Sequence, residues 1–130
     1  MPKATRLISI VDDDYSVRRA LGRLVQFAGF SAETFGSAED FLRSAALGLT
    51  ACLVLDIHLS GRMDGFDLQE RLTADQVTIP IIFITAHDDA ATSERVRRSG
   101  AAAYLRKPFD GQMLLDAIES AVRPEPGRSS

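Results

Sequence analysis

Residues 51–56 read Ala-Cys-Leu-Val-Leu-Asp (ACLVLD), a continuous apolar run that ends on the carboxylate of Asp56. Three other short apolar runs lead in the same way to polar side chains: residues 7–11 (LISIV) to Asp12 and Asp13, residues 81–84 (IIFI) to Thr85, and residues 102–105 (AAYL) through Arg106 to Lys107 and Pro108. Runs of this kind are typical of strands in a parallel sheet that is covered on both faces. Open α/β sheets bind ligands at the carboxyl ends of their strands, so we expect these polar side chains to gather at one site.

Helical patterns alternate with these runs, and one further short strand is expected at residues 30–35. The expected helices run from after Asp14 to Gly29, from Ser37 through Ala45, around residues 66–72, from Asp88 to just before Gly100, and from Asp110 to Val122. The later strands are expected at residues 79–85 and 102–106. Five strand–helix units in this length predict an α/β fold with a doubly wound, five-stranded parallel sheet and helices on both faces.

Composition favours one domain inside the cell. The 130 residues are enough for a single ordinary core, and a net charge of −3 gives no reason to expect nucleic-acid binding. The one cysteine, Cys52, lies in an apolar run, which suits a reducing cytoplasm. We expect a cytoplasmic protein without a membrane segment, with a domain at residues 1–123 and a flexible tail or clipped linker at residues 124–130.

Four motifs surround the expected strand ends: Val11–Asp14 (VDDD), Leu53–Asp56 (LVLD), Phe83–Ala86 (FITA) and Tyr104–Phe109 (YLRKPF). Each motif alone is weak. Together, in this order and spacing, they resemble the receiver domain of two-component response regulators over essentially all of residues 6–122. The resemblance implies the flavodoxin-like strand order 2-1-3-4-5, for which a receiver protein is one of the standard examples. That order would place Asp12 and Asp13 opposite Asp56.

Crowded carboxylates repel one another, and a small hard cation such as Mg²⁺ relieves that repulsion. The resemblance implies that Asp13 and Asp56 bind Mg²⁺ directly, with Mn²⁺ as an alternative ion. Asp12 would act largely through water, and the backbone carbonyl of His58 would supply another ligand. Asp56 would be the phospho-acceptor, the nucleophile that forms an aspartyl-phosphate.

The remaining motif residues acquire roles from the same resemblance. Lys107 would neutralise phosphoryl oxygens, and the hydroxyl of Thr85 would donate a hydrogen bond to one of them. A cis bond between Lys107 and Pro108 would aim the ammonium inward. Tyr104 is either a half-buried strand aromatic or the switch residue that responds to Thr85.

The loop after Asp56 departs from the usual family form. Ser60 stands where a proline is common, and Asp64 stands where a glycine is common, with Gly65 one position later. Residues 62–63 therefore look like a region that carries one extra residue. This departure affects expectations for loop geometry and partner recognition, and leaves the expected chemistry unchanged.

The two histidines, His58 and His87, stand two residues after Asp56 and Thr85. The resemblance places both beside the path of the water that hydrolyses the aspartyl-phosphate, where they would tune its lifetime. Exposed polar loop residues are the alternative interpretation. Histidine titrates near neutral pH, so either side chain is suited to such tuning.

The predicted function is a phospho-accepting receiver of a two-component or phosphorelay pathway. It would take a phosphoryl group from a sensor histidine kinase or histidine phosphotransfer protein, and would catalyse only its own phosphorylation and dephosphorylation. An output partner or a second copy would bind the face made by the fourth helix, fifth strand and fifth helix, near Arg95, Arg98, Tyr104 and Arg106.

Two alternatives remain open. A metal-dependent phosphatase with an aspartyl nucleophile is disfavoured, because Asp56-Ile57-His58 stands where such enzymes often carry Asp-x-Asp. A longer DNA-binding transcription regulator would need an output domain, for which these 130 residues leave no room beyond residue 123. We therefore expect no direct nucleic-acid binding by this chain.

Overall fold

The computed structural model describes residues 6–123. Its centre is a five-stranded parallel sheet in the order β2-β1-β3-β4-β5, which confirms the predicted fold class and strand order. The strands are β1 (Leu7–Val11), β2 (Ser31–Phe35), β3 (Thr50–Asp56), β4 (Ile81–Thr85) and β5 (Ala103–Arg106). The helices are α1 (Tyr15–Phe27), α2 (Ala38–Leu42), α3 (Gly65–Ala74), α4 (Ala90–Ser99) and α5 (Gly111–Val122), with a short 3₁₀ helix, η2 (Ala45–Leu49). The expectations for residues 1–5 and 124–130 lie outside the described residues.

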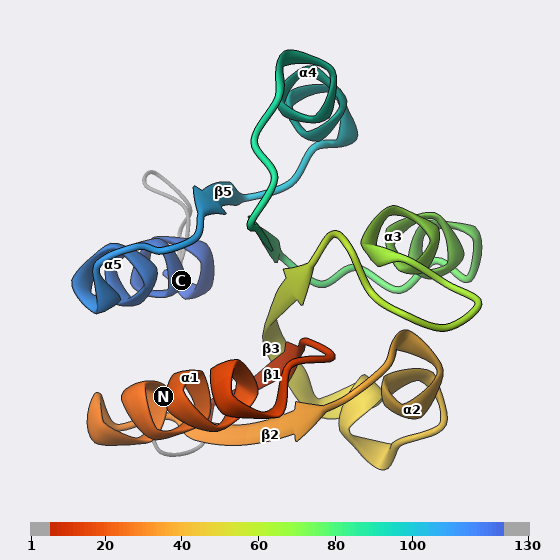
Figure 1. Cartoon of the computed structure of the whole chain (residues 1–130). Coiled ribbons are helices and arrows are strands. Elements are labelled where there is room, and N and C mark those ends of the chain that lie inside the picture. The colour runs from red at the N-terminus through yellow and green to blue at the C-terminus, as the bar shows by residue number, and fades with distance from the viewer. Residues whose placement is uncertain (1–5, 124–130) are drawn as a thin grey trace.

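Helices cover both faces of the sheet, α1 and α5 on one face and α2, α3 and α4 on the other (Figure 1). Alternate residues of β1 and β3 face opposite layers, as strand geometry requires. Ile8 and Val54 pack in the layer with α1 and α5, whereas Leu53 and Leu55 pack in the other. Cys52 is fully buried, and burial raises the pKa of its thiol to about 12.

Each α-helix among the described residues begins with a side-chain cap from aspartate or serine: Asp14, Ser37, Asp64, Asp89 and Asp110. These side chains accept hydrogen bonds from backbone N–H groups that lack partners within the helix. Asp64 and Asp67 form a reciprocal capping box at α3. The caps fix the point at which the chain turns from each strand end into the following helix.

The helix expected from Ser37 through Ala45 is two separate elements. The hydroxyl of Ser37 accepts from the N–H of Asp40 and opens α2, which ends at Leu42. Ser44 then accepts from the N–H of Ala46 and begins η2, so Ala45 belongs to the 3₁₀ helix. A serine that bonds its own neighbouring backbone offers the chain an alternative to continuing a helix.

The strand expected at residues 79–85 is shorter, because β4 begins at Ile81. Pro80 has no N–H group, and its carbonyl accepts from the N–H of Leu53 at 2.9 Å.

No helix within residues 6–123 is long and apolar enough to cross a membrane.

The register of the sheet aligns the strand ends. Val11 pairs with Leu55, and Asp56 pairs with Ile84. The residue after β1 therefore lies beside the last residue of β3. This alignment brings the side chains that follow these strands to one edge of the sheet.

Candidate functional site

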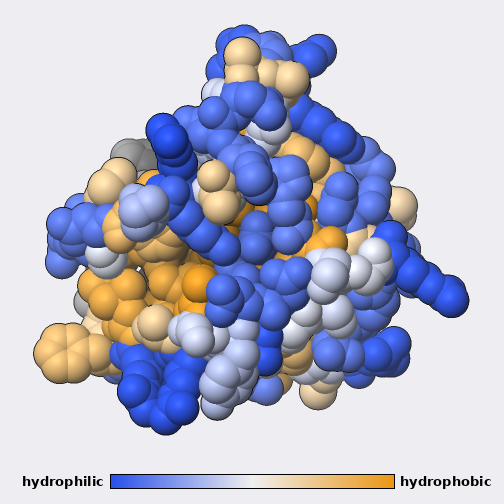
Figure 2. All heavy atoms as spheres, in the orientation of Figure 1, coloured by the Kyte–Doolittle hydropathy of each residue, from blue (hydrophilic) through white to orange (hydrophobic). Residues whose placement is uncertain are grey.

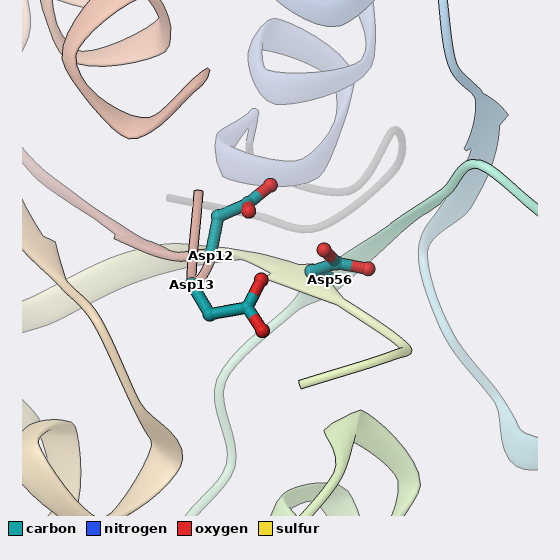
Figure 3. Close-up of side chains that lie close together, drawn as sticks. All are labelled: Asp12, Asp13 and Asp56. Carbon is teal, nitrogen blue, oxygen red and sulfur yellow. The ribbon is translucent and has the colours of Figure 1, made fainter. Parts of the chain in front are cut away.

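Three carboxylates converge where β1 and β3 end (Figure 3). Oxygen atoms of Asp12, Asp13 and Asp56 all lie within 4.8 Å of one another. Asp12 is fully buried and Asp56 is 5% exposed, whereas Asp13 is exposed. Such a set of hard oxygen donors fits Mg²⁺, which takes carboxylate ligands and retains several waters.

Asp12 is fixed by the turn that it begins. Its backbone N–H donates to the carbonyl of Phe35, and its Oδ1 accepts from the N–H of Asp14 at 2.9 Å. The guanidinium of Arg18 donates to the carbonyl of Asp12 at 3.0 Å. These bonds hold the β1–α1 turn so that the Asp12 carboxylate lies inside the site.

Lys107 places a positive charge between two of the carboxylates. Its Nζ lies 2.7 Å from Oδ2 of Asp12 and 3.2 Å from Oδ2 of Asp56. The peptide bond between Lys107 and Pro108 is cis. The lysine is thus an ion-pair partner of both buried acids, a contact that the sequence motifs alone did not specify.

The electrostatic effects on Asp56 oppose one another. Burial raises the pKa of this carboxyl, and the charge of Asp12 raises it further. Lys107 lowers the pKa of Asp56, and so does the N–H of His58, which donates to Asp56 Oδ1 at 3.0 Å. Burial and repulsion prevail, so the net shift is upward. Burial disfavours the charged form of Lys107, but its bonds to Asp12 and Asp56 outweigh this and raise its pKa.

Thr85 ends β4 and is fully buried. Its Oγ1 accepts from the N–H of His87 at 3.0 Å and lies 3.1 Å from the carbonyl of His87, to which it donates. The hydroxyl in this structure therefore holds the turn between β4 and α4. If the Thr85 side chain rotated to place Oγ1 near a new acceptor, both hydrogen bonds with His87 would be lost.

Tyr104, in β5, is half-buried, and its hydroxyl donates to Oδ1 of Asp88 at 2.9 Å. Partial burial and the hydrogen bond to Asp88 raise the pKa of Tyr104 to about 12. This bond links the strand next to Thr85 with the β4–α4 loop.

His58 and His87 are both exposed. Their rings meet edge to face, with centroids 5.1 Å apart and planes at 90°. The imidazoles therefore join the loop after Asp56 to the loop after Thr85. The sequence placed the two histidines near the site, and the structure brings them into contact.

Sequence reasoning missed Glu39 of α2, which contacts the loop after Asp56. Its Oε2 accepts from the N–H of Met63 at 3.1 Å. Glu39 belongs to none of the strand-end motifs, so only the three-dimensional structure reveals the contact.

An apolar groove of about 440 Å³ opens beside Lys107. Its walls come from α1, from the residue after β4 and from the segment that leads into α5: Val17, Ala20, Leu21, Ala86, Pro108 and Phe109. Figure 2 shows apolar residues gathered between α1 and α5, next to a hydrophilic region around the site. A partner that contacts this groove would lie close to Asp56.

A family model described as "Response regulator receiver domain" matches residues 8–119. The chain belongs to this family, as the resemblance predicted. It is a receiver domain of the two-component response-regulator type, rather than an ordinary enzyme that turns over a separate substrate. This assignment favours the receiver interpretation over the phosphatase alternative.

Among curated proteins, the chain is 42% identical over 116 residues to Nodulation protein W of Bradyrhizobium diazoefficiens, which covers 89% of this chain and 51% of the relative. It is 37% identical over 130 residues to Response regulator protein TodT of Pseudomonas putida, covering all of this chain and 57% of that protein. The chain thus spans a little over half the length of these relatives.

Solved structures of response regulators have a similar fold. The structure of the response regulator StyR matches with a TM-score of 0.83 and 47% identity over 92% of this chain and 60% of that chain. The crystal structure of FixJ-N matches with a TM-score of 0.79 and 32% identity over 90% of this chain and 93% of that chain.

Proposed function

We propose that this chain accepts a phosphoryl group on Asp56 from a phosphohistidine of a sensor kinase or phosphotransfer protein, in a reaction that requires Mg²⁺. The convergence of Asp12, Asp13, Asp56 and Lys107 at one edge of the sheet carries this proposal. Family membership supports it.

Asp56 is the nucleophile. One of its oxygens forms a bond to phosphorus while the phosphorus–nitrogen bond of the donor breaks, and the electron pair returns to the donor imidazole. Lys107 lowers the pKa of Asp56 and so favours the carboxylate form that attacks. Its ammonium then pairs with the phosphoryl oxygens, whose charge it offsets.

Asp13 and Asp56, the backbone carbonyl of His58 and, largely through water, Asp12 would hold Mg²⁺, or Mn²⁺ in its place. The bound ion would neutralise charge on the transferring phosphoryl group. The donor set supports this assignment, because three carboxylates with a single nearby ammonium retain net negative charge.

Phosphorylation would change the surface through Thr85 and Tyr104. The Thr85 hydroxyl turns from the carbonyl of His87 to a phosphoryl oxygen, and the β4–α4 turn rearranges. The bond from Tyr104 to Asp88 then breaks, so that the tyrosine moves inward. The face of α4, β5 and α5 thereby presents a different surface to an output partner or to a second copy of the chain. This is a shift between two populated states, set by their different affinities for the partner.

The phosphoryl donor would approach along the apolar groove beside Lys107, because Lys107 lines this groove and its Nζ lies 3.2 Å from Oδ2 of Asp56. His58 and His87 would shield phospho-Asp56 from water, because their rings lie in contact across the two loops at its rim. Self-dephosphorylation by water would then be slow.

A role within a longer transcription regulator is a second proposal. The chain is 38% identical to Transcriptional regulatory protein FixJ of Bradyrhizobium diazoefficiens. The match includes 95% of this chain but only 60% of FixJ. We propose that the native protein carries a DNA-binding output domain under the control of this receiver. The mass of the endogenous protein tests this directly: a mass near 14.2 kDa would contradict it.

The phospho-acceptor proposal is tested by incubating the purified chain with acetyl phosphate, with and without Mg²⁺, and measuring the intact mass. We expect a gain of one phosphoryl group that requires Mg²⁺ and is lost in Asp56→Asn. Asp40→Asn, at an exposed position on α2, is the matched control and should be labelled normally. Labelling of Asp56→Asn at the wild-type rate would refute the proposal.

A further inference from the structure

The loop between β3 and α3, residues 57–64, returns to the strand from which it leaves. The N–H of Gly65 donates to the carbonyl of Ile57 at 2.9 Å. A Cβ atom at position 65 would lie 2.5 Å from the carbonyl oxygen of Asp56, so only glycine allows this approach. Gly61, at the turn of the loop, has a φ of 111°, another conformation that favours glycine. The loop therefore follows a closed, defined path.

Two carboxylates hold this loop from opposite sides. On the side of the acidic cluster, Oδ2 of Asp13 accepts from the N–H of Ser60 at 2.8 Å. On the side of α2, Oε2 of Glu39 accepts from the N–H of Met63 at 3.1 Å. Glu39 is half-buried, and its second oxygen lies 3.5 Å from where a Cβ of Gly61 would stand. The loop is thus connected to a candidate metal ligand at one point and to α2 at another.

The bond from Ser60 to Asp13 orients a side chain that is otherwise exposed. A carboxylate has two oxygens, so one bond to a backbone N–H fixes its direction and leaves the other oxygen for a cation. Hydrogen bonds of this kind to metal ligands change metal affinity by roughly 10- to 100-fold when they are lost. The position of Ser60 depends on the path of the loop, and Glu39 restrains that path.

We infer that Glu39 is a positioning residue for the metal site and acts through the loop on Asp13. The inference rests on the proposed function, since it concerns the affinity of the same site for Mg²⁺. Glu39 itself binds no metal ion; it holds Met63, which keeps Ser60 within hydrogen-bond distance of Asp13.

The neighbouring acid on the same helix supplies a matched control. Asp40 is exposed and pairs with Arg43 at 2.7 Å on the surface. Replacement of Asp40 removes the same charge from the same helix and leaves the loop contact intact. A difference between the two positions therefore reports on the hydrogen bond to Met63.

The experiment measures Mg²⁺ affinity by titration in wild type, Glu39→Ala, Glu39→Gln, Glu39→Asp and Asp40→Ala, with amide hydrogen exchange of Ser60 and Met63 in each. Because Glu39 acts one step from the ligand, Glu39→Ala should weaken Mg²⁺ binding by about 3- to 10-fold, less than loss of a direct contact to a ligand. Both amides should exchange faster. Glu39→Gln keeps an oxygen acceptor at the same reach and should bind Mg²⁺ almost as wild type does. Glu39→Asp keeps the charge but is one methylene shorter, and should resemble the alanine variant.

Equal Mg²⁺ affinity in Glu39→Ala and Asp40→Ala would overturn the inference while leaving the proposed function intact. The inference would also be overturned if Glu39→Gln and Asp40→Ala bound Mg²⁺ equally weakly while Glu39→Asp bound it normally. That result would mean that the negative charge on α2, and not the hydrogen bond to Met63, determines the Mg²⁺ affinity. If Glu39→Ala does not fold, the comparison of the Gln and Asp variants decides the question in the same way. Absence of Mg²⁺ binding in wild type would overturn both the inference and the proposed metal site.

Discussion

Replacement of Asp56 by asparagine should stabilise the metal-free protein, although it removes the proposed nucleophile. Asp56 is 5% exposed and shares the site with the fully buried Asp12. Its raised pKa means that the folded state disfavours the ionised form relative to the unfolded chain. Asparagine has almost the same shape, still accepts from the N–H of His58, and carries no charge. The Lys107 ammonium keeps its shorter contact, 2.7 Å to Asp12.

Two opposing contributions determine the change in the free energy of unfolding. The substitution removes the desolvation of the Asp56 charge and its repulsion by Asp12, which stabilises the protein, and it also removes the ionic contact of 3.2 Å with Lys107, which destabilises it. Neutral replacement of buried ionic groups stabilises proteins by roughly 1–4 kcal/mol in favourable cases. We expect an increase of about 1–3 kcal/mol in the free energy of unfolding at pH 7.5, within that general range, because the raised pKa of Asp56 shows that folding disfavours its charge.

The difference in stability between Asp56→Asn and wild type should become smaller as the pH is lowered. A carboxyl whose pKa is raised in the folded state makes the wild type more stable as pH falls from above that raised pKa toward the ordinary value of about 4. The advantage of Asp56→Asn should therefore be complete above the raised pKa and shrink as the pH is lowered. It should vanish where Asp56 is protonated in both states.

Urea unfolding in EDTA, followed by circular dichroism at several pH values, measures this difference. Asp40→Asn is the control, and its exposed pair with Arg43 should change stability by less than about 1 kcal/mol. Mg²⁺ at ten times its dissociation constant should add about 1.4 kcal/mol to wild type and less to Asp56→Asn, which narrows the gap. If Asp56→Asn is less stable than wild type in EDTA, or if the stability difference does not change with pH, the charge of Asp56 does not destabilise the folded metal-free protein.

Three further predictions concern metal, switch and lifetime. Asp13→Ala should bind Mg²⁺ at least about 10-fold more weakly, because a carboxylate ligand is lost, and should be labelled slowly by acetyl phosphate; undiminished affinity in a Mg²⁺ titration argues against a ligand role for Asp13. Phosphorylation should alter amide exchange in α4 and β5, and Tyr104→Ala should reduce that change; exchange differences confined to the loop after Asp56 would contradict the proposed switch. Phospho-Asp56 should decay several-fold faster in His58→Ala or His87→Ala if the imidazoles exclude water, which a phosphate-release assay between about pH 6 and 8 measures. Slower decay would assign them to water positioning, and unchanged decay in both variants would leave them as ordinary loop residues.

Much of this fold could be predicted because β1, β3 and β4 are largely apolar runs that are buried on both faces and lead to polar residues at the sheet edge. The edge strands β2 and β5 are more exposed. The order of the strands came from the resemblance to receiver domains, because periodicity alone does not specify which strands are neighbours. Boundaries were less accurate where local bonds decide them, as at Ser44, whose hydroxyl begins a new helix, and at Pro80, which lacks an N–H.

The acidic cluster could also be predicted, since Asp12 and Asp13 follow β1, Asp56 ends β3, and the resemblance implied that these two strands are neighbours. The contact of Lys107 with Asp12 could not be predicted from the sequence, because a long flexible side chain can reach many positions from one backbone site. The contact of Glu39 with Met63 was equally unpredictable, since it depends on the path of the loop between β3 and α3. Interactions that cross between elements require the packed structure.

The proposed role of Asp56 as the residue that carries the phosphoryl group can be tested by locating the adduct. Wild-type protein is labelled with acetyl phosphate in Mg²⁺, and the acyl phosphate is reduced with borohydride, which converts a phosphorylated aspartate to homoserine. Peptide mass mapping then identifies the converted residue. We expect homoserine at position 56 alone. Conversion at Asp12 or Asp13 with Asp56 intact, or labelled protein without homoserine at position 56, would contradict it.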